Sequence, residues 1–119
     1  MKKTLVLGAS EKVDRYSNMA VQRLVAHGHR VLAVGARKGS IGNILIETDF
    51  PENEKIDTLT LYLNPVAQQD YYDDILKLKP KRIIFNPGTE NQELETLAAQ
   101  QGIETTRACT LVMLSTGLF

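Results

Sequence analysis

The sequence predicts one doubly wound α/β domain over residues 1–119, built on a mostly parallel sheet. Apolar runs of strand length alternate with longer stretches of helical period, and turn residues separate them. With 119 residues, 43% of them hydrophobic, the chain is long enough for one core and too short for two. This alternation predicts right-handed crossovers, which place helices on both faces of the sheet.

The expected elements follow one another along the chain. They are strands at 4–8, 30–35, 57–64 and 82–88, helices at 17–28, 66–79 and 90–102, and a final strand that begins at 103. The strands are apolar runs, which is typical of strands buried on both faces of a parallel sheet. Residues 38–50 are predicted to be a loop with room for a short strand at 44–46. The last residues, to 117, are ambiguous between strand, loop and short helix.

Capping residues and apolar spacing predict where the helices begin and which faces they bury. Ser17 or Asn18 is the expected N-cap of the first helix and Thr89 that of the third, whereas Gly28 and Gly102 follow helix ends. The residues expected to face the core are Met19, Ala20, Val21, Leu24 and Val25, then Val66, Tyr72, Ile75 and Leu76, and finally Leu94, Leu97 and Ala98.

Composition excludes several classes of function. Fourteen basic and fourteen acidic residues cancel, so no overall charge favours nucleic acid or an anionic membrane. A single cysteine excludes an internal disulfide framework and favours a reducing compartment. No apolar stretch approaches the ~20 residues that cross a bilayer. We therefore expect a cytoplasmic protein.

In a doubly wound sheet the ligand binds beyond the carboxyl ends of the strands. The first such segment, VLGASEKVDRYSN, has a glycine turn and then the start of a helix, whose free N–H groups favour phosphate. A serine hydroxyl can donate a hydrogen bond to phosphate, and an arginine can donate two. Ser17 and Asn18 could instead be only caps. The candidate residues in this segment are Gly8, Ala9, Ser10, Arg15, Ser17 and Asn18.

The segment after the second strand, VGARKGS, lacks the acidic residue that usually binds the ribose of NAD. Gly35, Arg37 and Lys38 are candidates here. Two adjacent cations fit a phosphorylated ribose, either the 2′-phosphate of NADP or the 3′-phosphate of coenzyme A. The alternative is a solvated basic loop.

Two further segments complete the predicted walls. Asn64 and Pro65 end one strand, and the turn NPGTEN follows another and can expose backbone groups to a ligand. The same turn could simply be a tight entry into the next helix. The candidate residues are Leu63, Asn64, Pro65, Asn86, Pro87 and Gly88.

The sequence contains no recognisable catalytic constellation. Cys109 is expected to be a small buried thiol near the ligand, because a nucleophilic cysteine needs a base. His27 and His29 lie at the far end of the first helix, and we expect them to be surface turn residues on the opposite rim. We therefore expect a binding protein that is not an enzyme.

Two long stretches, from VLGASEKVDRYSN to VGARK and from NPGTENQELE to ACTLVM, resemble the small stand-alone CoA-binding proteins. Their Rossmann-like domain is similar to the N-terminal domain of the succinyl-CoA synthetase alpha subunit. The residues at positions that match the family pattern are Gly8, Ser10, Arg15, Ser17, Asn18, Gly88, Glu90 and Cys109. The family usually has asparagine-proline where this chain has Gly35 and Ala36.

The resemblance implies that coenzyme A or an acyl-CoA is the ligand. Ser10, Arg15 and the helix terminus would hold its pyrophosphate, and Arg37 and Lys38 would lie near its 3′-phosphate. Two alternatives stay open: an NADP-binding oxidoreductase-like domain, and a regulatory or interaction module with a vestigial pocket. The apolar ending TLVMLSTGLF must be buried by this domain or by a partner, so a homodimer or a partner chain is possible.

Overall fold

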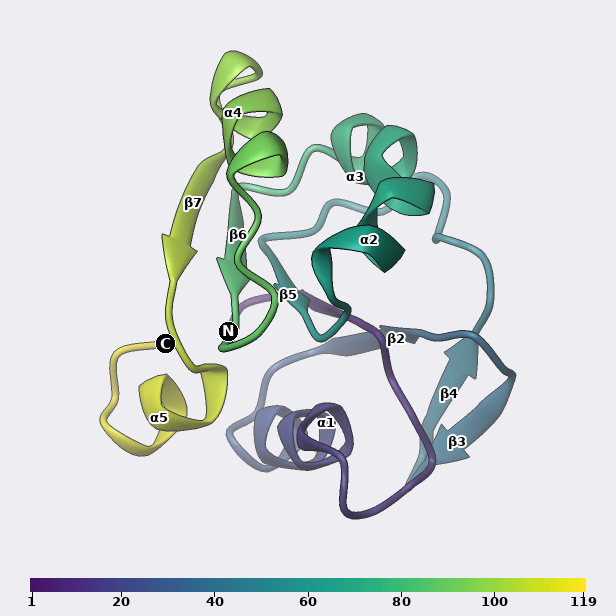
Figure 1. The fold of residues 1–119 in the computed structure, drawn as a ribbon. Helices are drawn as coiled ribbons and strands as arrows, with labels where there is room; N and C mark the ends of the chain where they lie inside the picture. Colours follow the sequence, from purple (N-terminus) through teal and green to yellow (C-terminus); the bar gives the residue numbers. More distant parts are fainter.

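The computed structural model describes all 119 residues. They form one sheet with helices on both faces (Figure 1). The strands are β1 (Thr4–Leu7), β2 (Val31–Val34), β3 (Gly39–Ile41), β4 (Ile44–Glu47), β5 (Thr58–Leu61), β6 (Arg82–Phe85) and β7 (Glu104–Arg107). The helices are α1 (Tyr16–Ala26), α2 (Pro65–Gln68), α3 (Tyr72–Leu78), α4 (Gln92–Gln100) and α5 (Thr110–Ser115), with a 3-10 turn, η1 (Gln69–Tyr71), between α2 and α3.

The seven strands are arranged in the order β3-β4-β2-β1-β5-β6-β7. All neighbouring pairs are parallel except β3 and β4, which are antiparallel. The chain leaves β1 toward β2 on one side and later returns to β5 on the other side. The order of strands therefore reverses beside β1, which confirms the predicted doubly wound, Rossmann-like fold.

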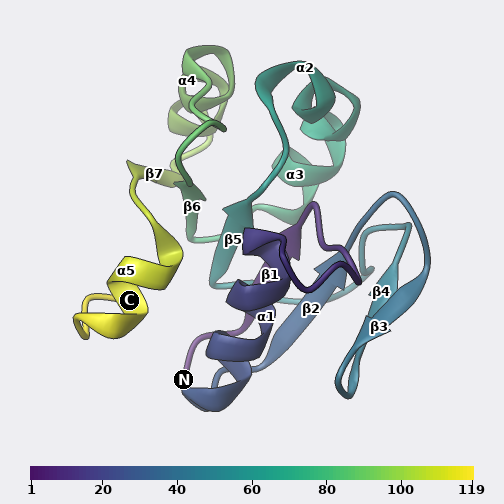
Figure 2. The ribbon, with the colours of Figure 1, turned by 60° about the horizontal axis from the view of Figure 1, so that its bottom comes forward.

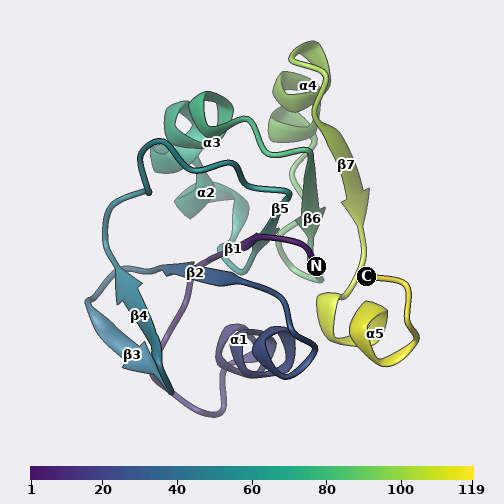
Figure 3. The same ribbon diagram turned by 180° about the vertical axis from the view of Figure 1, so that it is seen from behind.

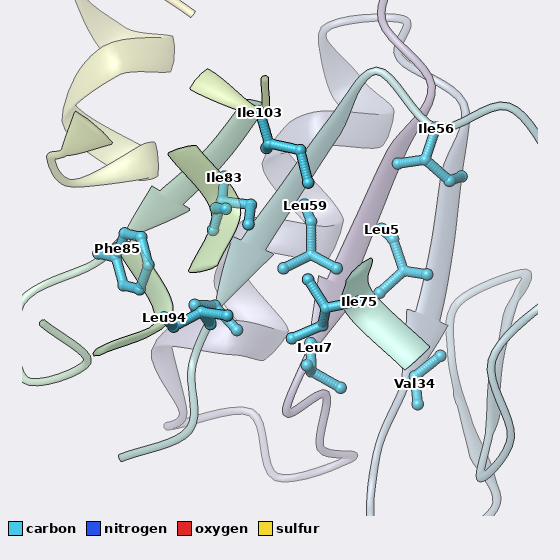
Figure 4. Close-up of a cluster of buried hydrophobic side chains, with 12 residues drawn as sticks. Leu5, Leu7, Val34, Ile56, Leu59, Ile75, Ile83, Phe85, Leu94 and Ile103 are labelled. Atoms are coloured by element: carbon cyan, nitrogen blue, oxygen red, sulfur yellow. The ribbon is translucent and has the colours of Figure 1, made fainter. Parts of the chain in front are cut away.

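Two apolar cores cover the two faces of the sheet. Leu5, Leu7, Leu59 and Ile83 pack with residues of α3 and α4, and Figure 4 shows this cluster. On the other face, Val6 packs with residues of α1 and α5. Figures 1 and 3 show the same layers from opposite sides. The four residues of β1 are completely buried, as predicted for a central parallel strand.

Several local predictions were wrong. The short strand expected at 44–46 is β4, but β3 was not predicted, and the two strands form an antiparallel hairpin with Gly42 at a φ of 58° in its turn. The expected single helix over 66–79 is interrupted by η1, and Val66 is 75% exposed. Val25 is also partly exposed. These errors share a cause, because apolar spacing does not reveal which side chains the neighbouring elements cover.

The predicted N-caps were also wrong. Arg15 is the N-cap of α1 and Asn91 is that of α4. Ser17 and Asn18 lie inside the helix and are buried. The ambiguous final segment contains α5, which buries Thr110 and Leu114 against this same domain but leaves Val112 and Leu118 exposed. No helix is both long and apolar enough to cross a membrane.

Candidate functional site

A cleft of about 240 Å³ lies at the carboxyl ends of β1, β5 and β6, where the strand order reverses. Eight predicted residues line it: Gly8, Ser10, Arg15, Ser17, Leu63, Asn64, Pro87 and Gly88. Tyr16, Tyr62 and Thr89 line it as well. The other predicted residues, which are Ala9, Asn18, Gly35, Arg37, Lys38, Pro65 and Asn86, do not form its wall.

Gly8 lets the first loop approach the neighbouring strand closely. Its φ is 98°, and a Cβ placed there would lie 3.0 Å from the carbonyl carbon of Tyr62. Side chains rarely adopt this backbone conformation. A glycine is therefore needed both for the turn and for the contact with the end of β5.

Gly35 has a packing role that the sequence did not reveal. A Cβ at this position would lie 2.3 Å from the carbonyl oxygen of Ala9, so only a glycine allows the end of β2 to lie against the first loop. The preceding carbonyl, that of Val34, accepts hydrogen bonds from the N–H groups of Gly8 and Ala9 at 2.8 and 3.0 Å. Gly35 and Ala9 thus hold the shape of the loop from behind.

Asn18 supports the same loop from inside α1. Its side-chain amide donates to the carbonyl of Ser10 at 2.9 Å, and its oxygen accepts from Gln22 at 2.6 Å. The Ser10 hydroxyl accepts from the N–H of Lys12 at 3.1 Å. Its own proton remains available to a ligand, because a hydroxyl can donate and accept at once.

The amino end of α1 forms one wall of the cleft. No side chain caps it, and its first turn contains no acidic residue. The Ser17 side chain is 3% exposed and lines the cleft, and its hydroxyl has no hydrogen-bond partner in the protein. Arg15 lies at the same wall and belongs to neither of the two ion pairs of the structure. Free N–H groups, the partial positive charge of a helix end and a guanidinium together favour an anion.

The opposite wall is held by a buried amide that sequence reasoning missed. Gln68 is completely buried and donates to the carbonyls of Leu63 and Thr89 at 2.9 and 2.8 Å. It therefore ties together the segments that follow β5 and β6. Nothing in the sequence distinguishes Gln68 from the exposed Gln69. Asn64 caps α2 by accepting from the N–H of Ala67 at 2.8 Å.

In the turn after β6, Asn86 has a structural role. It is 2% exposed, and its side chain donates to the Thr60 hydroxyl and accepts from the N–H of Thr110. The next residues, Pro87 and Gly88, line the cleft, and the Gly88 N–H donates to Glu90 at 2.9 Å. Thr89 donates to the carbonyl of Asn86 and does not cap α4.

Arg37 and Lys38 are exposed in the turn between β2 and β3 and have no ion-pair partner. They lie at the carboxyl end of β2, beside the first loop and outside the cleft. Glu11 connects this turn to the loop, because its carboxylate accepts from the N–H of Ser40 at 3.1 Å. Gly39 leaves the space that the Glu11 side chain occupies.

Tyr62 contributes a buried hydroxyl that has no hydrogen-bond partner. Burial raises its pKa to about 12, so it stays protonated at neutral pH. The nearby hydroxyls of Thr60 and Thr110 bond to each other at 2.8 Å. Cys109, which precedes α5, is half-buried.

The two histidines lie away from the cleft, at the amino ends of the strands. His27 is exposed, as expected. His29 is partly buried, however: it accepts from the N–H of Lys2 at 3.0 Å and packs edge-on against Phe119. Burial lowers the pKa of His29.

Comparisons with known proteins agree with this architecture. A family model described as a CoA binding domain matches residues 2–115. A crystal structure of an uncharacterized protein is 52% identical, with a TM-score of 0.96, and the match covers 100% of this chain and 98% of that one. A hypothetical protein from Pyrococcus horikoshii OT3 is 24% identical, with a TM-score of 0.88 over 99% of this chain and 84% of that one.

A dinucleotide-forming acetyl-coenzyme A synthetase from Ca. Korarchaeum cryptofilum, solved with phosphate and ADP, shares the fold. It is 15% identical, with a TM-score of 0.70, and the match covers 89% of this chain and 25% of that one. No curated protein matches this chain.

Proposed function

The chain belongs to the CoA-binding domain family, and from this premise we propose that it binds coenzyme A or an acyl-CoA as a protein without catalytic activity of its own. The proposed site is the cleft at the carboxyl ends of β1, β5 and β6. The pyrophosphate of the ligand lies against the amino end of α1.

The observation that carries this proposal is the unsatisfied amino end of α1. The first N–H groups of a helix have no partner inside it, so a side-chain cap, water or a ligand must satisfy them. Here the cap, the acidic residues and a partner for the Ser17 hydroxyl are all missing from the same turn. A diphosphate would satisfy the N–H groups and the hydroxyl, and Arg15 would neutralise part of its charge.

The cleft holds only part of the ligand. Its volume of about 240 Å³ is below the ~300–1,000 Å³ of sites that enclose drug-sized molecules. The remainder of coenzyme A would lie along the exposed surface, where Arg37 and Lys38 would meet its 3′-phosphate.

The proposal that the protein is not an enzyme rests on the chemistry of the wall. The wall offers hydroxyls, backbone groups, the Asn64 amide and one guanidinium. General acid–base catalysis is most efficient with a pKa near the working pH. Tyr62, with a pKa of about 12, is far from that range.

Calorimetric titration with coenzyme A tests the proposal. We expect Arg15→Ala to weaken binding roughly ten- to a hundredfold, because a hydrogen bond to a charged group contributes ~1.5–3 kcal/mol. Arg23→Ala is the matched control, since Arg23 is an exposed arginine in the last turn of the same helix. Equal affinities of the two variants would remove Arg15 from the site.

Titration with NADPH must accompany this experiment, because the exposed pair Arg37 and Lys38 also suits a 2′-phosphate. We expect coenzyme A to bind and NADPH to bind far more weakly. Tight binding of NADPH alone would favour an oxidoreductase-like domain. Binding of neither nucleotide would favour an interaction module with a vestigial pocket.

A further inference from the structure

A second hollow, of about 340 Å³, lies away from the proposed ligand site, over β2 and β4. Its lining is mostly apolar and includes Leu32, Val34, Ile44 and Leu45. The Ile44 and Ile46 side chains pack on the α1 side of the sheet, so Leu45 points to the opposite face. Leu45 is 67% exposed there. We call this hollow the β2–β4 groove.

The topology explains why this apolar surface is open. Parallel sheets are normally covered by helices on both faces, because a helix usually connects one parallel strand to the next. Here the connection from β4 back across the sheet to β5, residues 48–57, contains no helix, although its Phe50 and Ile56 pack into the core on this face. Figure 2 shows the β3–β4 hairpin at the outer edge of the sheet, away from α3 and α4. The face of β2 and β4 opposite α1 is therefore left without a helix.

Acidic residues surround the open end of the groove. A neighbouring hollow of about 650 Å³ shares Asp49 and Pro51 with it, so the two are adjacent. The carboxylates that line the two hollows are Glu47, Asp49, Glu52, Glu54 and Asp74. Only Glu54 is in an ion pair, with Lys3, and the single lining cation is Lys77. The chain as a whole has no net charge, so this acidic excess is local.

We propose that the β2–β4 groove is the docking site for an amphipathic helix of a partner protein, with an apolar stripe and lysines or arginines along its flank. The apolar stripe would cover Leu32 and Leu45 in the place of the missing crossover helix. The basic flank would meet Asp49 and Glu52. Such a helix-in-groove contact buries apolar area, and the charges select its partner.

The charges argue against a second copy of this chain in the groove. In a two-fold dimer each copy presents the same patch, so the two acidic rims would face each other. Like charges in that arrangement are destabilising. The inference does not depend on the proposed ligand, because the groove shares no residue with the cleft.

A leucine–lysine peptide of about 18 residues with helical spacing is a suitable probe for the intact protein. We expect nuclear magnetic resonance shifts to be confined to β2, β4 and residues 48–54. The corresponding leucine–glutamate peptide should not bind. Added salt should weaken binding of the lysine peptide, because the carboxylates are exposed.

Matched variants distinguish binding in the β2–β4 groove from nonspecific attraction of the basic peptide to acidic residues. Asp49→Lys/Glu52→Lys should weaken peptide binding at least about tenfold, whereas Asp70→Lys/Glu93→Lys, with the same change of net charge on exposed residues elsewhere, should not. Leu45→Ser should weaken it, and Leu118→Ser, at a similarly exposed leucine, should leave it unchanged.

Equal effects of the two charge variants, or shifts spread over the whole surface, would overturn the proposal. So would a concentration-dependent dimer that Leu45→Ser dissociates, since the groove would then hold a second copy. Coenzyme A titrations of the same variants show separately whether the ligand proposal holds.

Discussion

The amino ends of α1 and α4 lie at the same rim of the sheet, but only that of α4 is capped by a side chain. Each follows a strand and a glycine with positive φ, Gly8 at 98° and Gly88 at 91°. Asn91 caps α4 by accepting from the N–H of Leu94, and Glu93 and Glu95 occupy its first turn. The first turn of α1 has no side-chain cap and no acidic residue.

The two helix ends therefore differ in whether the protein itself supplies partners for their polar groups. The end of α4 is satisfied by the protein itself, so its residues hold the fold together. The end of α1 retains N–H groups, the Ser17 hydroxyl and the Arg15 guanidinium without partners. Contacts outside this turn hold the loop before it in place: Gly35 allows close packing, Asn18 donates to Ser10, and the Val34 carbonyl accepts from Gly8 and Ala9.

The largest expected difference concerns the two glycines. Gly8→Ala should lower the free energy of unfolding by about 3 kcal/mol, because it adds a contact with the Tyr62 backbone to the cost of a positive φ. Gly88→Ala should cost only about 1–2 kcal/mol, since no atom lies within 4 Å of its added Cβ. Urea denaturation measures both. Equal losses would mean that the first loop is not packed as described.

Removing one polar side chain from each helix end should affect different properties. Asn91→Ala should cost about 2 kcal/mol of stability, because Asn91 caps α4 and also donates to Gln68 and Tyr72. Ser17→Ala should change stability by no more than about 0.5 kcal/mol, yet weaken coenzyme A binding roughly tenfold. Thermal unfolding and calorimetry distinguish these effects. A large loss of stability in Ser17→Ala would show that the hydroxyl has a structural partner.

Two tyrosines extend the comparison with a smaller effect. Tyr72→Phe should cost about 1 kcal/mol, because its hydroxyl accepts from Asn91 at 2.8 Å. Tyr62→Phe should cost nothing at neutral pH, since the Tyr62 hydroxyl has no partner.

The same tyrosine predicts a dependence on alkaline pH. Burial raises the pKa of Tyr62 from 10.0 to about 12, so the unfolded chain loses this proton first. The contribution of Tyr62 to the free energy of unfolding is therefore fully present below pH 10 and is lost as the pH rises toward 12. Denaturation at a series of pH values should show a shallower fall in Tyr62→Phe than in the wild type. Identical slopes would contradict the burial of this hydroxyl.

Three of the four predicted segments contribute residues to the cleft, whereas the supporting roles of individual residues were not predicted. Gly8, Ser10, Arg15 and Ser17 were predicted for the cleft and line it. Asn18 and Asn86 were predicted as candidate contacts, but both are buried supports. Tyr16 and Thr89 were not among the candidates, since a tyrosine or threonine at a helix entry has no chemical pattern that marks it.

The sequence by itself determined the order of elements, the parallel sheet and the rim at which the cleft lies. These follow from apolar periodicity and from the handedness of crossovers, which are properties of short stretches of chain. Tertiary structure alone decided that Gly35 must lack a side chain, that Gln68 joins two walls, and that no helix covers the face of β2 and β4 opposite α1. Each depends on the close approach of segments far apart in sequence, which no local pattern records.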